Sequence, residues 1–381
     1  MLRNIDNLRV VRSTRGRRVL LSLLLAVVLL ATLAGGNALA KGSPPDHHET
    51  SMTVFATGLD APRGLKFGPD GYLYVAEGGK GGLNSTEGQC EQVIPPVGPY
   101  TGDMTARISR ISPDGERTTV VDGLPSSQTS PALGSLVSGV ADVAFLKGKL
   151  YALLAGAGCS HGIPDVPNGV IRVNKDGTWN LIADLSAFQQ AHPVLQPEED
   201  DFEPDGTWYS MVAVGSSLYA IEPNHGELDR ITSKGKISRI IDISASQGHI
   251  VPTSIAYFRG NFYVGNLTVF PLVEGAAKIL KINKGGRIKA SMEGFTNIVA
   301  AVFDRKGNLY VLESTTGNPM PTPDTGVVVR MGRDGGKETI ATGLSLPTAM
   351  TFGPDGALYI SNKGFGYPPG AGEVVKIELG D

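Results

Sequence analysis

The sequence predicts an all-β protein, a six-bladed β-propeller closed by an N-terminal strand that completes the last blade. Three observations support this prediction. First, a strand-turn-strand phrase that carries a tyrosine recurs six times along the chain. Second, nearly the same phrase stands at both ends, LKFGPDGYLYVAE at residues 65–77 and MTFGPDGALYISN at residues 350–362, each at the same distance after an ATGL segment. Third, the last unit lacks a fourth strand, and an unpartnered strand precedes the first unit.

The repeated unit has the pattern of a four-stranded blade. In each unit an apolar strand and a turn lead to a second strand marked by a tyrosine: Tyr74, Tyr151, Tyr219, Tyr263, Tyr310 and Tyr359. A third, alternating strand follows, and in the first five units a turn and a fourth strand complete the unit. The last three spacings lie near the roughly 40–45 residues of such a blade. The first two spacings are longer and predict insertions.

The strand at residues 52–59 accounts for the incomplete last unit. Its sequence, MTVFATGL, matches KETIATGL, the fourth strand of the fifth unit. We expect it to pair with the last unit, which would join the two ends of the chain in one ring and remove open sheet edges. A solenoid is the alternative, but it would need polar caps at both ends, and the sequence shows none.

The first 40 residues have the layout of a secretory signal peptide. Six arginines precede an apolar run at residues 19–33, and Ala38-Leu39-Ala40 offers a cleavage site. We therefore expect a signal peptide at 1–40 that is cleaved near Ala40, a flexible linker at 41–51, the propeller at 52–381, and a secreted or periplasmic location. An uncleaved membrane anchor is the alternative, but the run is shorter than the roughly 20 apolar residues of a spanning helix.

The charge of the chain argues against nucleic acid and membranes as partners. The formal net charge is −3, and removing residues 1–40 takes away six arginines and only one acidic residue, Asp6. The mature chain is therefore more acidic and has no cluster of lysine and arginine, so we expect neither nucleic acid nor an anionic membrane to bind it. We expect a monomer whose partner is a small molecule or another protein.

Two insertions lengthen the first two units. Residues 78–102 form a stretch rich in glycine and proline, and residues 184–207 contain DLSAFQQAH, which predicts a short helix with Asp184 as its N-cap. Loops of this length on a rigid propeller form a lid or a binding wall, or else a solvated excursion. The sequence leaves both open.

The chain has two cysteines, Cys90 and Cys159, each in the loop after the second strand of adjacent units. Such loops emerge on the same face of a propeller, and an exported protein folds in an oxidising environment. We therefore predict a structural disulfide between them, with two free thiols as the alternative.

Polar side chains end the second strand of most units. In five of the six units, the residue three positions after the marker tyrosine carries a side-chain oxygen; these residues are Glu77, Glu222, Asn266, Glu313 and Asn362. The second unit has Leu154 at this position. No cofactor is certain from the sequence, but calcium takes oxygen ligands of this kind, so the five are candidate metal ligands. Alternatively, the same side chains accept hydrogen bonds from backbone amides of the next turn.

The sequence holds no strong catalytic signature, neither Gly-x-Ser-x-Gly nor His-Glu-x-x-His nor a phosphate loop. Topology places His161, His225 and His249 toward one face. His225 and His249 are the candidates for a general base in lactone or ester hydrolysis, and plain surface histidines are the alternative.

Residues at the start of each first strand are expected to line the central channel. The candidate ligand-binding residues are Arg63, Asp142, Trp208, Tyr209, Asn224 and Asn297, with Thr253 and Thr348 at equivalent positions. Trp208 and Tyr209 would form an aromatic wall for a planar or sugar ligand, or would pack the second insertion onto the propeller.

The amino-acid sequence from about residue 53 to the end of the chain resembles that of the ScyD/ScyE family of exported bacterial propellers. The strings GAGCSHG, EPNHGELDRI, FEPDGTWYSM and DISASQGHIVPT are the most specific. The repeats are also similar to those of NHL and gluconolactonase-type propellers. The resemblance implies export and a six-bladed ring, but no established reaction. Compared with calcium-dependent lactonase propellers, Leu154 breaks the polar ring.

Three functions follow as hypotheses. The first is a secreted or periplasmic binding or accessory protein for a small molecule such as a secondary metabolite. The second is a calcium-dependent lactonase or esterase with its site at the channel. The third is a cell-surface module that binds another protein. The sequence leaves open whether the protein is an enzyme.

Overall fold

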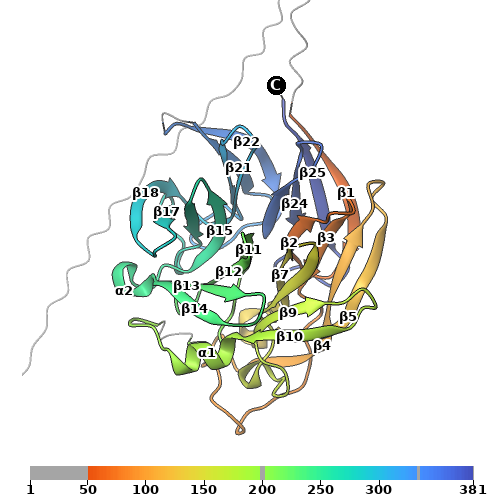
Figure 1. Cartoon of the computed structure of the whole chain (residues 1–381), viewed down its shortest axis with the longest axis vertical. Coiled ribbons are helices and arrows are strands. Elements are labelled where there is room, and N and C mark those ends of the chain that lie inside the picture. Colours follow the sequence, from red (N-terminus) through yellow and green to blue (C-terminus); the bar gives the residue numbers. More distant parts are fainter. Residues whose placement is uncertain (1–49, 198–201, 333–334, 381) are drawn as a thin grey trace, which may run out of the picture. The chain divides into compact units, whose positions relative to one another are not determined.

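The computed structural model describes residues 50–197, 202–332 and 335–380. These residues form the predicted six-bladed β-propeller, with six antiparallel sheets arranged around a central axis (Figure 1). The predicted signal peptide and residues 41–49 of the predicted linker lie outside the described residues. Within the described part of the chain, no helix is long and apolar enough to cross a membrane.

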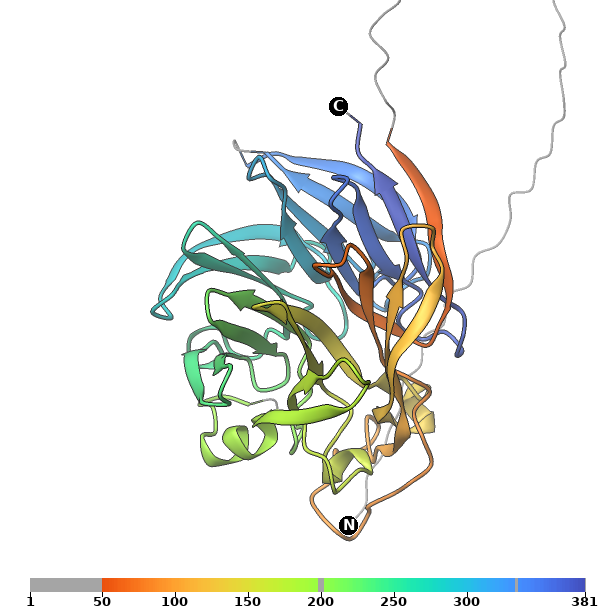
Figure 2. The same ribbon diagram turned by 45° about the vertical axis from the view of Figure 1, so that its right-hand side comes forward.

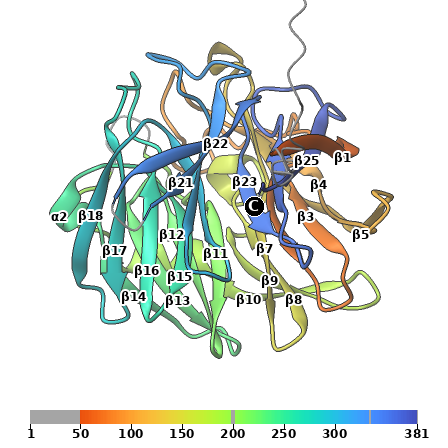
Figure 3. The ribbon, with the colours of Figure 1, turned by 90° about the horizontal axis from the view of Figure 1, so that it is seen from above.

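Each blade is one antiparallel sheet, and its strands run side by side (Figure 3). The first blade holds β2 (Pro62–Phe67), β3 (Leu73–Glu77), β4 (Thr101–Ile111), β5 (Arg117–Gln128) and the short β6 (Val137–Ser138). The second holds β7 (Val140–Leu146), β8 (Lys149–Leu154), β9 (Gly169–Val173) and β10 (Trp179–Asp184). The third holds β11 (Ser210–Val214), β12 (Ser217–Glu222), β13 (Glu227–Thr232) and β14 (Ile237–Asp242).

The remaining three blades follow the same order. The fourth holds β15 (Pro252–Phe258), β16 (Asn261–Asn266), β17 (Ala277–Asn283) and β18 (Ile288–Phe295). The fifth holds β19 (Ile298–Phe303), β20 (Leu309–Glu313), β21 (Gly326–Met331) and β22 (Lys337–Leu344). The sixth holds β23 (Ala349–Phe352), β24 (Leu358–Asn362), β25 (Gly372–Glu378) and, as its outer strand, β1 (Ser51–Leu59).

In the first and sixth blades the recurrent tyrosine closes the turn that precedes its own strand. The Tyr74 hydroxyl donates a hydrogen bond of 2.8 Å to the carboxylate of Asp70, and Tyr359 donates one of 2.9 Å to Asp355. Both aspartates stand in the GPDG turns between the first and second strands. The phrase repeated at both ends of the chain is therefore a turn together with the side chain that fastens it.

The strand β1 pairs antiparallel with β25 along its whole length, so the two ends of the propeller lie together in the sixth blade (Figure 2). Aromatic contacts reinforce this pairing. The ring of Tyr359 in β24 stands edge-on to Phe55 of β1 and to Phe67 of β2, with ring centroids 5.0 and 4.9 Å apart. Side chains as well as backbone hydrogen bonds thus hold β1 in the sixth blade, and the contact of Tyr359 with Phe67 joins this blade to the first.

The hydrophobic core lies between adjacent blades. Ile108 and Leu124 of the first blade, for example, are fully buried in one cluster with Val143 and Leu154 of the second. Leu154 departs from the polar residues at the equivalent place in the other blades because this side chain packs between two sheets.

The two insertions are fastened to the propeller. Cys90 and Cys159 form the predicted disulfide, which ties the first insertion to the loop after β8. The predicted helix of the second insertion is also confirmed: α1 (Leu185–Ala191) begins after Asp184, whose carboxylate accepts a hydrogen bond of 2.8 Å from the amide of Ala187. A second short helix, α2 (Ser244–Gln247), follows β14.

Candidate functional site

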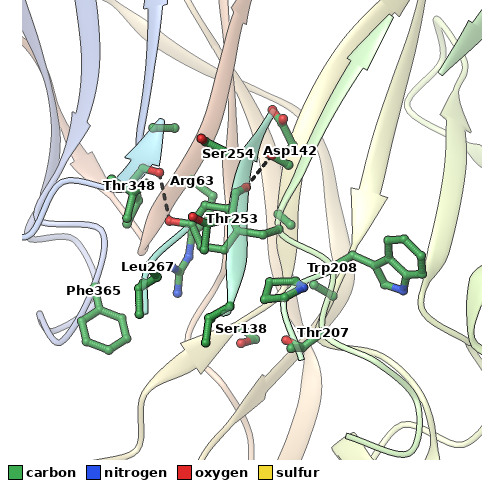
Figure 4. Close-up of a pocket in the computed structure, with 18 of the residues that line it drawn as sticks. Arg63, Ser138, Asp142, Thr207, Trp208, Thr253, Ser254, Leu267, Thr348 and Phe365 are labelled. Carbon is green, nitrogen blue, oxygen red and sulfur yellow. Dashed lines mark hydrogen bonds between the residues drawn. The ribbon is translucent and has the colours of Figure 1, made fainter. Parts of the chain in front are cut away.

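The first strands of the six blades enclose a central cavity of about 830 Å³ (Figure 4). Both insertions contribute to its wall: Pro96, Val97 and Tyr100 come from the first, and Glu203 and Thr207 from the second. The insertions therefore form part of the cavity wall, one of the two roles that the sequence left open.

Apolar side chains stand at the mouth of the cavity. Val269, Phe270 and Met320, from the loops after β16 and β20, line the cavity and are 47%, 52% and 57% exposed. Leu133 lies at the mouth on the side of the first blade and is also exposed. Exposed apolar side chains that gather around a cavity mark a surface on which a ligand or partner can be bound.

Hydrogen bonds between neighbouring blades fix the cavity wall. The Ser210 hydroxyl donates to the carbonyl of Thr253, and the Thr253 hydroxyl donates to the carbonyl of Ile298, each at 2.6 Å. The Thr348 hydroxyl donates to the carbonyl of Pro62 at 2.7 Å, across the junction of the sixth and first blades. The protein's own bonds therefore hold the innermost strands in place, as expected of a preformed site.

Asp142 joins three blades at this wall. Its carboxylate accepts hydrogen bonds of 2.7 Å from the amides of Val143 and of Met211 in the third blade. Gly64 of the first blade lies against it, and a Cβ there would stand 1.9 Å from a carboxylate oxygen, so the close approach requires glycine. Burial raises the pKa of Asp142 to about 6, while the charge of Lys66 opposes this shift.

Tyr209 spans the cavity. Its hydroxyl donates a hydrogen bond of 3.0 Å to the carbonyl of Thr348, from the third blade to the sixth. Burial raises the pKa of this phenol to about 12. Arg63 stands beside it and donates a hydrogen bond to the carbonyl of Val137. Burial lowers the pKa of Arg63, and the neighbouring Tyr209 opposes that shift.

Trp208 does not form the aromatic wall that was one reading of the sequence. Its backbone lies at the cavity, but its indole points away from it (Figure 4) and is only 1% exposed. The ring packs in the core between the second and third blades, against Leu153 and Leu185 among others. Tyr209 points the other way because successive side chains of an extended segment alternate in direction.

The five predicted metal ligands are not brought together, and none of them lines the cavity. Each of them instead accepts a hydrogen bond from the backbone of a nearby loop. Glu222 accepts hydrogen bonds from the amides of Thr207 and His225, and the other four, Glu77, Asn266, Glu313 and Asn362, likewise accept from backbone amides at the ends of loops.

These side chains do not fit a shared cation, because backbone amides already occupy their oxygens. Among the described residues, no group of three or more histidine, cysteine, aspartate or glutamate side chains is arranged to hold a metal ion. The calcium site at these five positions stays a prediction, and the hydrogen bonds of these side chains match its alternative, a structural hydrogen bond at the end of each second strand.

The remaining predicted residues separate into two groups. Asn224 and His249 line the cavity, as do Thr253 and Thr348. Asn297 does not; its amide donates to the carbonyl of Leu267 at 3.2 Å and so supports the wall from behind. His225 lies at a second, smaller cavity beside the disulfide, with its Nε2 3.0 Å from the carbonyl oxygen of Glu203.

Sequence reasoning missed a buried polar network under the insertions. The Tyr100 hydroxyl donates to the carboxylate of Glu203, whose other oxygen lies 3.5 Å from Nε2 of His161. Nδ1 of the same histidine lies 2.8 Å from the Ser127 hydroxyl. Burial lowers the pKa of His161 to about 4, with the charge of Asp205 opposing the shift, so the ring is neutral at neutral pH.

This network links the two insertions to each other, and both Tyr100 and Glu203 line the cavity. Ser127 and His161 have no exposed surface and support them from behind. The only signal in the sequence was His161, which topology placed toward this face. Tyr100 and Glu203 stand in insertions without a repeat, where no position can be inferred from another blade.

The fold and the cavity define a six-bladed β-propeller with a central pocket. Among solved structures, the chain is similar to a putative oxidoreductase (glucose dehydrogenase) from Thermus thermophilus, with a TM-score of 0.54, 16% identity, and coverage of 86% of this chain and 100% of that one. It is also similar to a gluconolactonase from Xanthomonas campestris, with a TM-score of 0.52, 11% identity, and coverage of 87% and 90%.

A luciferin-regenerating enzyme is similar as well, with a TM-score of 0.50, 11% identity, and coverage of 86% of this chain and 95% of that one. At these identities the likeness concerns the fold alone. No protein-family model matches the sequence, and no curated protein matches it.

Proposed function

We propose that this protein binds a small molecule in its central cavity. The observation that carries the proposal is the cavity itself, whose volume of about 830 Å³ falls within the roughly 300–1,000 Å³ of known small-molecule sites. Its lining is mainly apolar, with a few polar groups such as Arg63, Tyr209 and Thr253 that converge from different blades. Apolar walls that supply affinity and fixed polar groups that supply orientation are the usual composition of such sites.

The resemblance to the ScyD/ScyE family and the N-terminal layout support a finer version of the proposal. In it, the protein is exported, acts outside the cytoplasm as a monomer, and binds or assists the handling of a secondary metabolite. The acidic mature chain is consistent with a partner that is neither nucleic acid nor an anionic membrane.

Hydrolysis of a lactone or ester at the same cavity is the second candidate function. Two observations favour it: a gluconolactonase is among the structural neighbours, and His249, a candidate general base, lines the cavity. The calcium set expected for such an enzyme does not support it, because its oxygens accept backbone hydrogen bonds. Lactone turnover by the purified protein that disappears in His249→Gln would establish this function.

The neutral apolar dye N-phenylnaphthylamine tests the binding function, because its fluorescence rises on entering an apolar site. Leu267 lines the cavity, and Leu267→Trp would fill part of it. We expect this variant to bind the dye at least about tenfold more weakly. The matched control is Leu181→Trp, at a leucine that is 40% exposed on β10 and does not line the cavity. Equal binding by both variants would overturn the proposal.

Native mass spectrometry of the protein isolated from its own host addresses the ligand directly. We expect a retained small molecule in the wild-type protein and its loss in Leu267→Trp. A co-purifying protein in place of a small molecule would favour the third hypothesis, in which the exposed apolar mouth contacts a protein partner.

A further inference from the structure

Arg63 is a half-buried cation for which the described residues supply no acidic partner. The side chain lines the central cavity and makes a hydrogen bond to the carbonyl of Val137. Figure 4 shows its guanidinium in the cavity, between Leu267 and Ser138. No carboxylate in the part of the chain that the structure describes forms an ion pair with it.

Arg107, in the same blade, is an arginine whose positive charge is paired with acidic side chains. Its guanidinium binds Glu77 through Nε at 2.8 Å and Nη2 at 2.7 Å, and Asp60 lies 3.2 Å away. These acids raise the pKa of Arg107, whereas burial without an acid lowers the pKa of Arg63. Withdrawing an arginine from water without a counter-ion costs free energy, so an anion bound beside Arg63 would offset that cost.

The acids that line the cavity are already engaged elsewhere. The oxygens of Asp142 accept hydrogen bonds from Val143 and Met211, and Glu203 accepts one from Tyr100. Neither acid forms an ion pair with Arg63. The guanidinium retains further N–H donors beyond the one bound to Val137, in a planar fork that matches an acidic group with two oxygens.

The surroundings of Arg63 define the rest of the ligand. Leu267 and Phe365 lie on the same side of the cavity (Figure 4). The exposed Val269, Phe270 and Met320 of the apolar mouth line the same cavity. A molecule that reaches Arg63 from this mouth must place most of its surface against apolar side chains and only its inner end against a cation.

We propose that the cavity selects an apolar organic acid, whose carboxylate or similar anionic group binds the guanidinium of Arg63 while its apolar body fills the mouth. This inference rests on the proposed function and adds the chemical class of the ligand. Binding of the anion would supply the missing counter-charge, and in a site shielded from water this charge-assisted hydrogen bond is stronger than on a surface.

Two dyes of matched shape test the inference. Anilinonaphthalene sulfonate and N-phenylnaphthylamine share both ring systems, and only the first carries an anionic group. Fluorescence titration of the wild-type protein and of Arg63→Gln gives four dissociation constants. We expect Arg63→Gln to bind the sulfonate about 10- to 100-fold more weakly and to bind the neutral dye within about twofold of the wild type.

Two further variants control for charge and folding. Lys149→Gln removes the same charge at an exposed residue outside the cavity, and we expect it to bind both dyes as the wild type does. Arg63→Lys keeps the charge without the planar fork, and we expect an intermediate affinity for the sulfonate. Circular dichroism and thermal melting of each variant show that it is folded.

The outcomes separate the inference from the function on which it rests. If the neutral dye binds the wild type but the sulfonate shows no dependence on Arg63, the cavity is a binding site and the acid class is wrong. Equal loss of both dyes in Arg63→Gln would make the arginine structural and would also overturn the inference. If neither dye binds the wild type, both the function and the inference fail.

Discussion

The hydroxyl of Tyr209 donates a hydrogen bond of 3.0 Å to the carbonyl oxygen of Thr348 and so connects the third blade to the sixth across the cavity. Thr348 in turn binds the carbonyl of Pro62 in the first blade through its own hydroxyl. One tyrosine therefore links strands that belong to opposite sides of the ring. This arrangement makes the cavity wall sensitive to single side chains.

Tyr209→Phe should weaken this connection. The substitution keeps the ring and removes the hydroxyl, which leaves the Thr348 carbonyl without this donor, so we expect a loss of about 1–2 kcal/mol in the free energy of unfolding. Urea denaturation measures it. Tyr72→Phe is the control, because the Tyr72 hydroxyl has no hydrogen-bond partner among the described residues and the substitution should be neutral. Equal stabilities of the two variants would contradict the role given to Tyr209.

The N-terminal strand should contribute substantially to stability. Phe55 of β1 packs edge-on against Tyr359, so Phe55→Ala should cost about 2 kcal/mol. The neighbouring Val54 is 57% exposed, and Val54→Ala should change stability by no more than about 0.5 kcal/mol. Deleting residues 51–58 should lower the melting temperature far more than either substitution, and an unchanged melting curve would show that β1 does not support the propeller.

The disulfide should stabilise the wall that the first insertion contributes to the cavity. Replacing both cysteines with serine should cost about 2–4 kcal/mol and weaken binding of the neutral dye, because the insertion that carries Tyr100 is then held less firmly. Reduction of the wild-type protein should reproduce this result. The same reductant added to the double serine variant is the control, and any effect there would point to another cause.

Glu222 should stabilise the loops on either side of it through hydrogen bonds rather than bind a metal ion. Its carboxylate accepts hydrogen bonds from the part-buried amide of Thr207 and the buried amide of His225, so Glu222→Ala removes the acceptor of both and should cost about 2–4 kcal/mol. We expect the melting temperature of the wild type to be the same with a chelator and with added calcium. A melting temperature that rises with calcium and loses this rise in Glu222→Ala would restore the metal-site hypothesis.

Stability should fall as the pH rises from mildly acidic to alkaline. Glu227 and Asp229 in β13 have no exposed surface, and within the described residues Glu227 forms an ion pair with Arg239 whereas Asp229 forms none. Burial raises the pKa of Glu227 to about 9, with repulsion from Asp229 adding to the shift, and burial raises the pKa of Asp229 to about 7. Both carboxyls therefore bind protons in the folded state that the unfolded chain has already lost above about pH 4.5.

Since the folded state holds more protons between the unfolded and folded pKa values, the free energy of unfolding should decrease as the pH rises through this window, from about 4 to about 9. Asp142, with a pKa of about 6, adds to the decrease in the lower part of the window. Asp229→Asn should flatten the slope, whereas Asp165→Asn, at an exposed aspartate, should leave it unchanged. Urea titrations at several pH values measure the slope, and a rise in stability with pH would contradict this account.

The sequence predicted the ring because the ring is periodic. Each GPDG turn and its tyrosine repeat one local hydrogen bond, and that bond needs no information from elsewhere in the chain. The same periodicity located Arg63, Asp142 and Thr348 at the cavity, since residues at the start of each first strand face the axis. The disulfide followed from the equivalent positions of its two cysteines.

Periodicity also explains what could not be predicted. Whether an oxygen at the end of a second strand meets a cation or a backbone amide depends on the path of the next loop, and the loops do not repeat. Trp208 and Tyr209 are adjacent, so pattern alone could not decide which of them faces the axis. Tyr100 and Glu203 meet only because two unrelated insertions lie against each other.

The pairing of β1 with β25 has a consequence for how the protein is made. Ribosomes produce β1 among the first residues of the propeller and β25 among the last, so the earliest strand waits without its partner until synthesis is almost finished. During that interval the unpaired edge of β1 can pair with a wrong strand. Chaperones that bind β1 until β25 has been made should therefore raise the yield of correctly folded protein.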